Sequence, residues 1–455
     1  MASTLLGAVV WLGGANDAPQ ARAASKAPAL DATILAARPS VSVVIYGGGS
    51  ESDPRVAHPH TYQPSRLANL TTRPPGVPLA TLYVDRNGNC PNVPCYTTIQ
   101  TAVTAANPGD TINVTAGLYY ETVTVNKSLI LRGAQAGNDA RVGRTDETAE
   151  TVLNKDTGGF DLTSGPSNVT IDGFLIEGAS GPNGNARGIF ILGGSGYQVL
   201  NNILRYNSMG AFFSSDGTVQ TRFYRNRVEN NNNTPTGDGD TGLFGGSGPV
   251  NNVLIDSNQF AGNSSAGFTN VPSSPSSNLI ITNNSSTGDG TFAALFSTSA
   301  TQIISNTVTG AQGSAIYLGG NNSGTLVSGN NVSNGPFSAL RVDVFSGDTP
   351  NSNITANCNN LTANAYGIRI SPGALITGTL AMEAHNNNIA GNTVAGARND
   401  STAVNLNATT DWWGSATGPT NPGNPGGTGD IVTGTVTFAP FLTNPASCIG
   451  GTPQP

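Results

Sequence analysis

Short runs of alternating apolar and polar residues recur along the chain from about residue 168 onward. They are three to five residues long and follow a glycine or another small residue, as at 188–192, 315–318 and 367–370. Alternation with a period of two predicts β-strands, and no run has the i, i+3, i+4 spacing of a helix. Such short strands cannot bury an apolar face alone, so we expect strands from successive segments to stack on one another as a parallel solenoid.

An asparagine also recurs two places before an apolar residue, at intervals of about 27 residues. Asparagine tolerates the left-handed backbone of a tight bend, and stacked amides can hydrogen-bond to one another along a coil. We therefore expect one amide in each turn of a coiled chain, forming a structural ladder. The predicted members are Asn201, Asn226, Asn258, Asn306, Asn330, Asn359 and Asn387, with Asp172 as a variant first copy and Asn283 or Asn284 as a degenerate one.

The segments at either side of the repeats predict caps for this coil. The apolar residues of 99–106 share one face of a short helix, which Asn-Pro-Gly at 107–109 ends. An open solenoid end exposes unpaired backbone, so this helix is expected to cover it. At the other end, Trp412 and Trp413 are expected to close the coil rather than to stack on sugars. Strands are expected to follow the helix at 111–114, 122–125 and 129–131.

Two segments at the ends of the repeats contain distinctive motifs. They are Ile99-Gln100, Pro108-Gly109-Asp110-Thr111-Ile112, Gly117, Tyr119, Glu121, Val123, Lys127-Ser128-Leu129 and Gly133, and then Asp411-Trp412-Trp413-Gly414, Gly418-Pro419, Gly429-Asp430 and Ala439-Pro440-Phe441-Leu442. Together with the repeats, these segments resemble right-handed parallel β-helix proteins of the pectin-lyase-like superfamily over roughly residues 83–445. The resemblance implies an all-β, right-handed, single-stranded parallel β-helix with a short N-terminal capping helix. This fold hosts lyases, hydrolases, esterases, epimerases, adhesins and passive spacers, so the resemblance does not fix an activity.

The N-terminal residues predict export. Residues 1–25 contain an apolar run of signal-peptide length before a small-x-small site, and no later run reaches 18 apolar residues. Residues 26–80 lack sustained periodicity and are interpreted as a linker or pro-segment. The β-helix domain is expected over 81–445, with a tail at 446–455. We expect a secreted protein, located outside the cell or at its surface, without a membrane span.

Composition and cysteine usage narrow the function further. Charged residues make up 10%, Lys and Arg total 20, and the net charge is −7, so a broad basic surface for nucleic acid is excluded.

The chain has four cysteines, and an even number in an exported chain favours disulfides. Cys90 and Cys95 are close enough to form a small loop, whereas the pairing of Cys358 with Cys448 stays open.

One candidate surface emerges when the strands are aligned after their small residues. Aromatic rings followed by guanidinium groups suit stacking on sugars and pairing with sugar carboxylates, so this row predicts carbohydrate binding. The alternative is that a loop, either 26–80 or 230–242, covers the row. The residues of the shared outward phase are Phe190, Phe212, Phe244, Thr269, Leu295, Tyr317, Arg341 and Arg369.

Catalytic signatures of the enzymes with this fold are mostly absent. Polygalacturonase-like enzymes carry paired Asp, Gly-His-Gly and Arg-Ile-Lys, and only Arg369-Ile370-Ser371 is similar to the last. Arg341, Asp343 and Arg369 are the weak catalytic candidates that remain. His385 beside Glu383 is interpreted as a surface pair.

A metal site has one weak candidate. Asp238 and Asp240 lie in the Asn- and Gly-rich loop 230–242, and oxygen ligands of this kind suit Ca²⁺. A solvated loop is the alternative. No other cofactor is expected.

The sequence leaves three alternative functions open. The first is a non-catalytic surface protein that associates with polysaccharide or a cell-surface glycan. The second is a lyase or hydrolase of acidic polysaccharide near Arg341, Asp343 and Arg369. The third is a structural subunit of an extracellular filament that associates end to end, with the strand-like residues 41–46 pairing on a neighbour.

Overall fold

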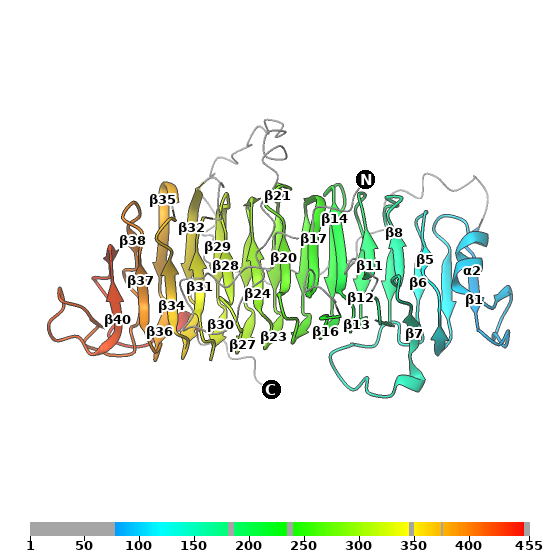
Figure 1. The fold of residues 1–455 in the computed structure, drawn as a ribbon, viewed down its shortest axis with the longest axis horizontal. Helices are drawn as coiled ribbons and strands as arrows, with labels where there is room; N and C mark the ends of the chain where they lie inside the picture. Colours follow the sequence, from blue (N-terminus) through cyan, green and yellow to red (C-terminus); the bar gives the residue numbers. More distant parts are fainter. Residues whose placement is uncertain (1–77, 181–185, 234–239, 345–349, 375, 450–455) are drawn as a thin grey trace.

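The chain winds into a right-handed parallel β-helix with the shape of a rod (Figure 1). The computed structural model describes residues 78–449 except 181–185, 234–239, 345–349 and 375. The predicted signal peptide, strand-like residues 41–46, Asp238 and most of the linker lie outside the described residues. Within them, no helix is long and apolar enough to cross a membrane.

Three long parallel sheets run the length of the rod, and each turn of chain contributes strands to them in succession. Sheet A contains β1 (Thr81–Val84), β2 (Cys95–Tyr96), β3 (Thr111–Val114), β6 (Ile130–Arg132), β9 (Thr170–Asp172), β12 (Gln198–Leu200), β15 (Thr221–Tyr224), β18 (Val253–Asp256), β21 (Ser276–Ser277), β22 (Leu279–Thr282), β25 (Thr298–Ser299), β26 (Gln302–Ile304), β29 (Ser323–Ser328), β32 (Asn351–Asn357), β35 (Ile376–His385), β38 (Leu406–Asn407) and β41 (Val436–Thr437). Sheet B contains β4 (Gly117–Tyr119), β7 (Thr151–Asn154), β10 (Phe174–Glu177), β13 (Ile203–Arg205), β16 (Arg227–Glu229), β19 (Gln259–Ala261), β23 (Ser285–Thr287), β27 (Thr307–Thr309), β30 (Asn331–Ser333), β33 (Asn360–Thr362) and β36 (Asn388–Ala390). Sheet C contains β5 (Val123–Thr124), β8 (Phe160–Leu162), β11 (Arg187–Ile191), β14 (Met209–Ser215), β17 (Thr241–Val250), β20 (Ala266–Asn270), β24 (Thr291–Leu295), β28 (Ile316–Leu318), β31 (Ser338–Val342), β34 (Tyr366–Ile370), β37 (Ala395–Asn399), β39 (Pro419–Thr420) and β40 (Gly429–Thr433).

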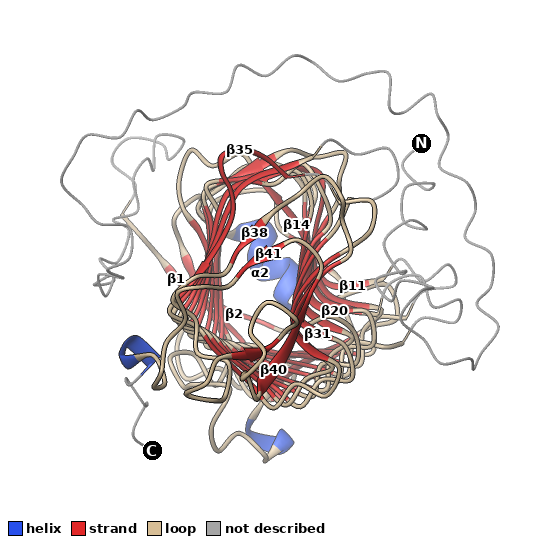
Figure 2. Cartoon of the chain, turned by 90° about the vertical axis from the view of Figure 1, so that its left-hand side faces the viewer, coloured by secondary structure: helices blue, strands red, loops and turns tan. Residues whose placement is uncertain are grey.

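The strands of the three sheets surround the axis of the rod (Figure 2). The main hydrophobic core consists of buried side chains that successive turns contribute. Because neighbouring strands are about 4.8 Å apart, each inward residue touches the equivalent residue of the next turn. One buried column in sheet A illustrates this stacking. It consists of Ile171, Val199, Phe223, Ile255, Ile281, Ile303, Val327, Ala356 and Ala384.

A buried amide ladder joins the turns between sheets A and B, and it corrects the sequence prediction at its first member. Asn226 shows the bonding of one rung. Its Oδ1 accepts from the backbone N–H and the Nδ2 of Asn202, one turn earlier. Its Nδ2 donates to the Oδ1 of the asparagine one turn later and to a backbone carbonyl. Asn201 is not a member: it has φ 52° and donates to Asp172. Asp172 is not the first copy either, because the N–H of Phe174 starts the ladder. The members are Asn202, Asn226, Asn258, Asn284, Asn306, Asn330, Asn359, Asn387 and finally Asp411.

The N-terminal end carries the predicted helical cap. Helix α2 spans Ile99–Ala105, and the side chain of Thr98 accepts a hydrogen bond from the N–H of Thr101 at its N-terminus. Of the three expected strands, β3 has the predicted bounds, and the bounds of β5 and β6 differ from the prediction by one residue at each end. The side chain of Trp413 is completely buried at the other end of the core, and Trp412 is half-buried.

Both disulfides form. Cys90 bonds to Cys95 beside the helical cap, as predicted, and Cys358 bonds to Cys448. The second bond fastens the C-terminal segment, including the 3₁₀ helix η2 (Ser447–Ile449), to the side of the coil.

Candidate functional site

The outward row expected from the sequence lies on sheet C, and its members from successive strands pair in register. The structure corrects one member: Leu295 points into the core, and Ala294 takes its place in the row. The row also continues by one further turn. Its members are Phe190, Phe212, Phe244, Thr269, Ala294, Tyr317, Arg341, Arg369 and Arg398.

The aromatic half of the row is packed rather than open. Phe212 stacks on Phe244 with ring centroids 5.2 Å apart, and Phe190 meets Phe212 edge to face at 5.4 Å. Phe212 and Phe244 are each only 3% exposed, so the expectation of an open stripe is wrong here. Leu192 and Val271 pack against this cluster.

Backbone from the long strand β17 closes over the same rings. A Cβ on Gly246 would lie 3.0 Å from the Phe244 ring and 3.1 Å from Phe212. The guanidinium of Arg187 lies 4.2 Å from the Phe190 centroid, and burial lowers the pKa of Arg187 to about 10. This half of the row therefore forms a small apolar cluster outside the main core.

The arginine half of the row is a network of cations and carboxylates from three successive turns. Arg341 contacts Asp343 at 2.8 Å through Nη2 and donates from Nε to the Ser371 hydroxyl at 2.9 Å. Asp400 accepts from two arginines. Arg369 donates to it from Nε at 3.2 Å, and Arg398 donates from Nε at 2.7 Å. Each of these three turns thus carries an arginine and, two residues later, a side chain with an oxygen acceptor.

The three arginines differ in their contact with the Tyr366 ring and in their exposure to solvent. The guanidinium carbons of Arg369 and Arg398 lie 5.0 and 5.9 Å from the Tyr366 centroid. Burial lowers the pKa of Arg369, whereas the hydrogen bond to Asp400 raises the pKa of Arg398. The side chain of Arg398 is 40% exposed, against 8% for Arg341 and 5% for Arg369. Arg398 is therefore the member best placed to contact a ligand.

The sequence prediction placed Arg341, Asp343, Arg369 and Tyr317 together correctly but missed Arg398 and its partners. The Tyr317 hydroxyl donates to the Asp343 carboxylate at 3.3 Å. The spacing Arg341-x-Asp343 recurs as Arg398-x-Asp400, with Arg369-x-Ser371 between them. This repeated spacing at successive turns was the signal that could have found the rest.

The other candidates lie elsewhere. Asp240 immediately precedes β17, and the described residues contain no group of three His, Cys, Asp or Glu side chains that could hold a metal ion.

His385 and Glu383 lie on sheet A. The Nε2 of His385 lies 2.7 Å from the Glu383 carboxylate, and its Nδ1 lies 2.8 Å from the Thr409 carbonyl. Glu383 also accepts from Asn407, which ties the pair into the join of β35 and β38.

Comparison with known proteins gives structural similarities alone. No family model matches the chain, and no curated protein matches its sequence. Among solved structures, ORF18 of Geobacillus virus E2 aligns with 14% identity and a TM-score of 0.37, over 64% of this chain and 61% of its own length. An alginate lyase from Paenibacillus sp. str. FPU-7 aligns with 15% identity and a TM-score of 0.38, over 79% of this chain and 99% of its own. The enzymatically active domain of tailspike protein 2 from bacteriophage CBA120 aligns with 13% identity and a TM-score of 0.40, over 75% of this chain and 49% of its own.

Proposed function

We propose that this chain is an extracellular, non-catalytic β-helix protein that binds an acidic polysaccharide along the outer face of sheet C. The observation that carries the proposal is the register of Arg341, Arg369 and Arg398 on adjacent strands. Strand spacing repeats a guanidinium about every 4.8 Å along the rod. A carboxylate of an acidic polysaccharide can pair with the exposed guanidinium of Arg398, because guanidinium groups suit bidentate recognition of carboxylates. The side chains of Arg341 and Arg369 are only 8% and 5% exposed and continue the row below the surface.

The contact with Asp400 occupies only part of the Arg398 guanidinium. A guanidinium carries five N–H donors, and the Nε of Arg398 is the donor that contacts Asp400. A sugar carboxylate can approach the exposed part of Arg398 while this contact stays in place. The two disulfides support an oxidising, extracellular location.

Titration calorimetry with polygalacturonate tests this function. Arg398→Gln removes the charge and is expected to weaken binding about tenfold, as the loss of one charge-assisted hydrogen bond would. Arg132→Gln is the matched control, because Arg132 is an exposed arginine on sheet A. Equal affinities for the wild type and Arg398→Gln would contradict the proposal.

Hydrolysis is a second candidate because Asp343 and Asp400 occupy equivalent places two turns apart, with Ser371 between them. Two strand spacings separate their backbone positions by about 10 Å, and inverting glycosidases hold their two carboxyl groups about 6.5–9.5 Å apart. Release of reducing ends from polygalacturonate that Asp400→Asn abolishes would establish this activity. Absence of such release in the wild type leaves binding as the function.

A further inference from the structure

From β10 onward, the bend after each strand of sheet B contains a left-handed residue, and one turn places a tyrosine there. Glycine and asparagine suit this conformation, whereas a bulky side chain in it is strained. Strain at one position of a repeat motivates the hypothesis that the side chain there has a function. The equivalent residues are Gly178 (φ 80°), Tyr206 (54°), Asn230 (51°), Gly262 (63°), Gly288 (66°), Gly310 (64°), Asn334 (60°), Ala363 (56°) and Gly391 (68°).

The ring of Tyr206 reaches solvent beside a hollow lined by amides. Tyr206 is 49% exposed, and together with Asn230, Asn232 and Asn233 it lines a space of about 600 Å³. Asn232 donates to the Gly262 carbonyl at 2.7 Å, and Asn233 donates to the Tyr206 carbonyl at 3.2 Å. These bonds hold two amides in place at the rim.

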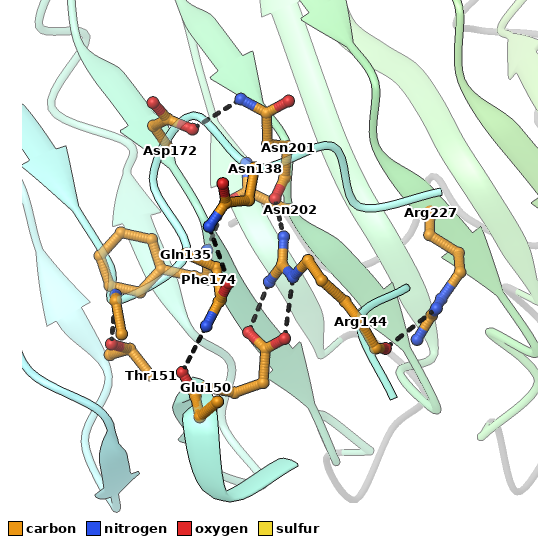
Figure 3. A network of polar contacts seen from close by, with 12 residues as sticks. Gln135, Asn138, Arg144, Glu150, Thr151, Asp172, Phe174, Asn201, Asn202 and Arg227 are labelled. Atoms are coloured by element: carbon orange, nitrogen blue, oxygen red, sulfur yellow. Dashed lines mark hydrogen bonds and ion pairs between the residues drawn. The ribbon is translucent and has the colours of Figure 1, made fainter. Parts of the chain in front are cut away.

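An inserted segment contacts the strand that precedes Tyr206 from outside the coil. Residues 133–150, which include the 3₁₀ helix η1 (Glu147–Ala149), loop out next to β7 (Figure 1). Arg144 forms a buried ion pair with Glu150, and its Nη1 also donates to the Asn201 carbonyl (Figure 3). The segment is therefore docked onto sheet B by groups that are costly to bury unpaired.

Through this segment, Glu147 reaches Arg205, the residue before the tyrosine. Arg205 pairs with Glu147 and contacts Glu177 at 2.8 Å, and its guanidinium carbon lies 5.2 Å from the Tyr206 centroid. Burial alone would lower the pKa of Arg205, but its hydrogen bonds to the two carboxylates raise it. Two carboxylates around one cation make this place unfavourable for an anionic ligand.

We propose that Tyr206, Asn230, Asn232 and Asn233 form a binding site for an uncharged glycan. An aromatic ring offers a flat apolar surface for the C–H face of a sugar, and the amides offer donors and acceptors to its hydroxyl groups. The site lies at the bend between sheets B and C, outside the arginine row, and it does not depend on the function proposed for that row.

Affinity electrophoresis with uncharged hexasaccharides of glucose, xylose and mannose tests the site. Tyr206→Asn removes the ring but keeps a residue that fits the left-handed bend, since asparagine occupies it at Asn230 and Asn334. We expect at least one of these glycans to bind the wild type at least tenfold more tightly than Tyr206→Asn, and Tyr206→Phe to retain binding.

Tyr120→Asn is the matched control, because Tyr120 is 70% exposed and lies outside the site. It should leave binding unchanged, as should Arg398→Gln, whose effect is confined to polygalacturonate. The site is refuted if none of the glycans binds in a manner that depends on Tyr206, or if Tyr120→Asn causes the same loss. Unfolding temperatures of all variants verify that each remains folded.

Discussion

The asparagine amide is suited to this coil because it accepts and donates at once. At Asn306, Oδ1 accepts from Asn284, and Nδ2 donates to Asn330 and to the Ile281 carbonyl. Each rung thereby satisfies polar groups on both neighbouring turns in a region from which water is excluded. No single hydroxyl or carboxylate can reproduce this set.

We expect Asn306→Ala to lower the free energy of unfolding by about 1–3 kcal/mol, since it leaves buried partners unpaired on both sides. Asn331→Ala is the control: Asn331 is exposed on neighbouring strand β30, and its loss should cost about 0.5 kcal/mol or less. Denaturant unfolding measures both. Equal effects of the two changes would contradict the ladder's role.

The ladder ends on the carboxyl group of Asp411, so the stability of the fold should depend on pH. Oδ1 of Asp411 accepts from the N–H of Asn387 at 2.7 Å and from its Nδ2 at 2.9 Å. Complete burial raises the pKa of Asp411 well above its ordinary value, although the bonds from Asn387 oppose the shift. The folded state then holds the proton more tightly than the unfolded state, so stability falls as pH rises above about 4.

Asp411→Asn should remove this penalty, because the amide keeps the acceptor and supplies the donor found in the other rungs. We expect it to stabilise the fold at pH 8 by about 1–3 kcal/mol and to have a smaller effect at pH 4. Thermal unfolding at the two pH values, with the exposed Asp156→Asn as a control, measures the difference. Destabilisation at pH 8 would count against a buried protonated carboxyl.

At the scale of elements, the strands of sheet C present different chemistry at the two ends of one row. Phe212 and Phe244 are covered by Val271 and by the backbone of β17, whereas Arg398 reaches solvent. The same register therefore supports packing in one half and a candidate binding surface in the other.

This division predicts that Phe212→Ala affects stability and not binding. Truncation of a buried phenylalanine costs about 3–5 kcal/mol, while affinity for polygalacturonate should equal that of the wild type. Calorimetry on the folded variant separates the two effects. A loss of affinity comparable to that of Arg398→Gln would show that the aromatic half also contacts the glycan.

The alternation along each strand predicted the order of the row, but not which members are covered. Along a strand, side chains point alternately inward and outward, so their direction can be predicted from the local sequence. This prediction was wrong only where two neighbouring residues fit the pattern equally well. Asn201 and Asn202 both precede an apolar residue by two places, and Ala294 and Leu295 are both apolar. Burial of Phe212 depends on β17 and Val271, which are distant in sequence, so no local pattern reveals it.

A second ladder was also predictable in principle. Five residues after the first, Asn207, Asn231 and Asn263 repeat the same bonding and end on Asp289. Its spacing is as regular as that of the first ladder, but these asparagines follow the apolar residue of each repeat, whereas the predicted pattern places an asparagine before it. Burial raises the pKa of Asp289 to about 6, against hydrogen bonds from Ser286 and Asn263.

At the scale of the whole molecule, every site assigned above depends on one geometric property of the rod. Side chains about one turn apart in sequence lie side by side on its surface, so a face of the rod collects one residue from each turn. The arginine row, the amide ladders and the surroundings of Tyr206 are all built in this way. An error of one residue in register would disperse them.

Cysteine cross-linking tests this register most directly, because all four native cysteines are already paired. Thr307 on β27 and Asn331 on β30 are exposed partners in adjacent turns, so Thr307→Cys with Asn331→Cys should oxidise readily to a third disulfide. Thr307→Cys with Ser333→Cys places the two Cα atoms about 8 Å apart and should stay reduced under the same conditions. Efficient bonding in the second pair and not in the first would contradict the account.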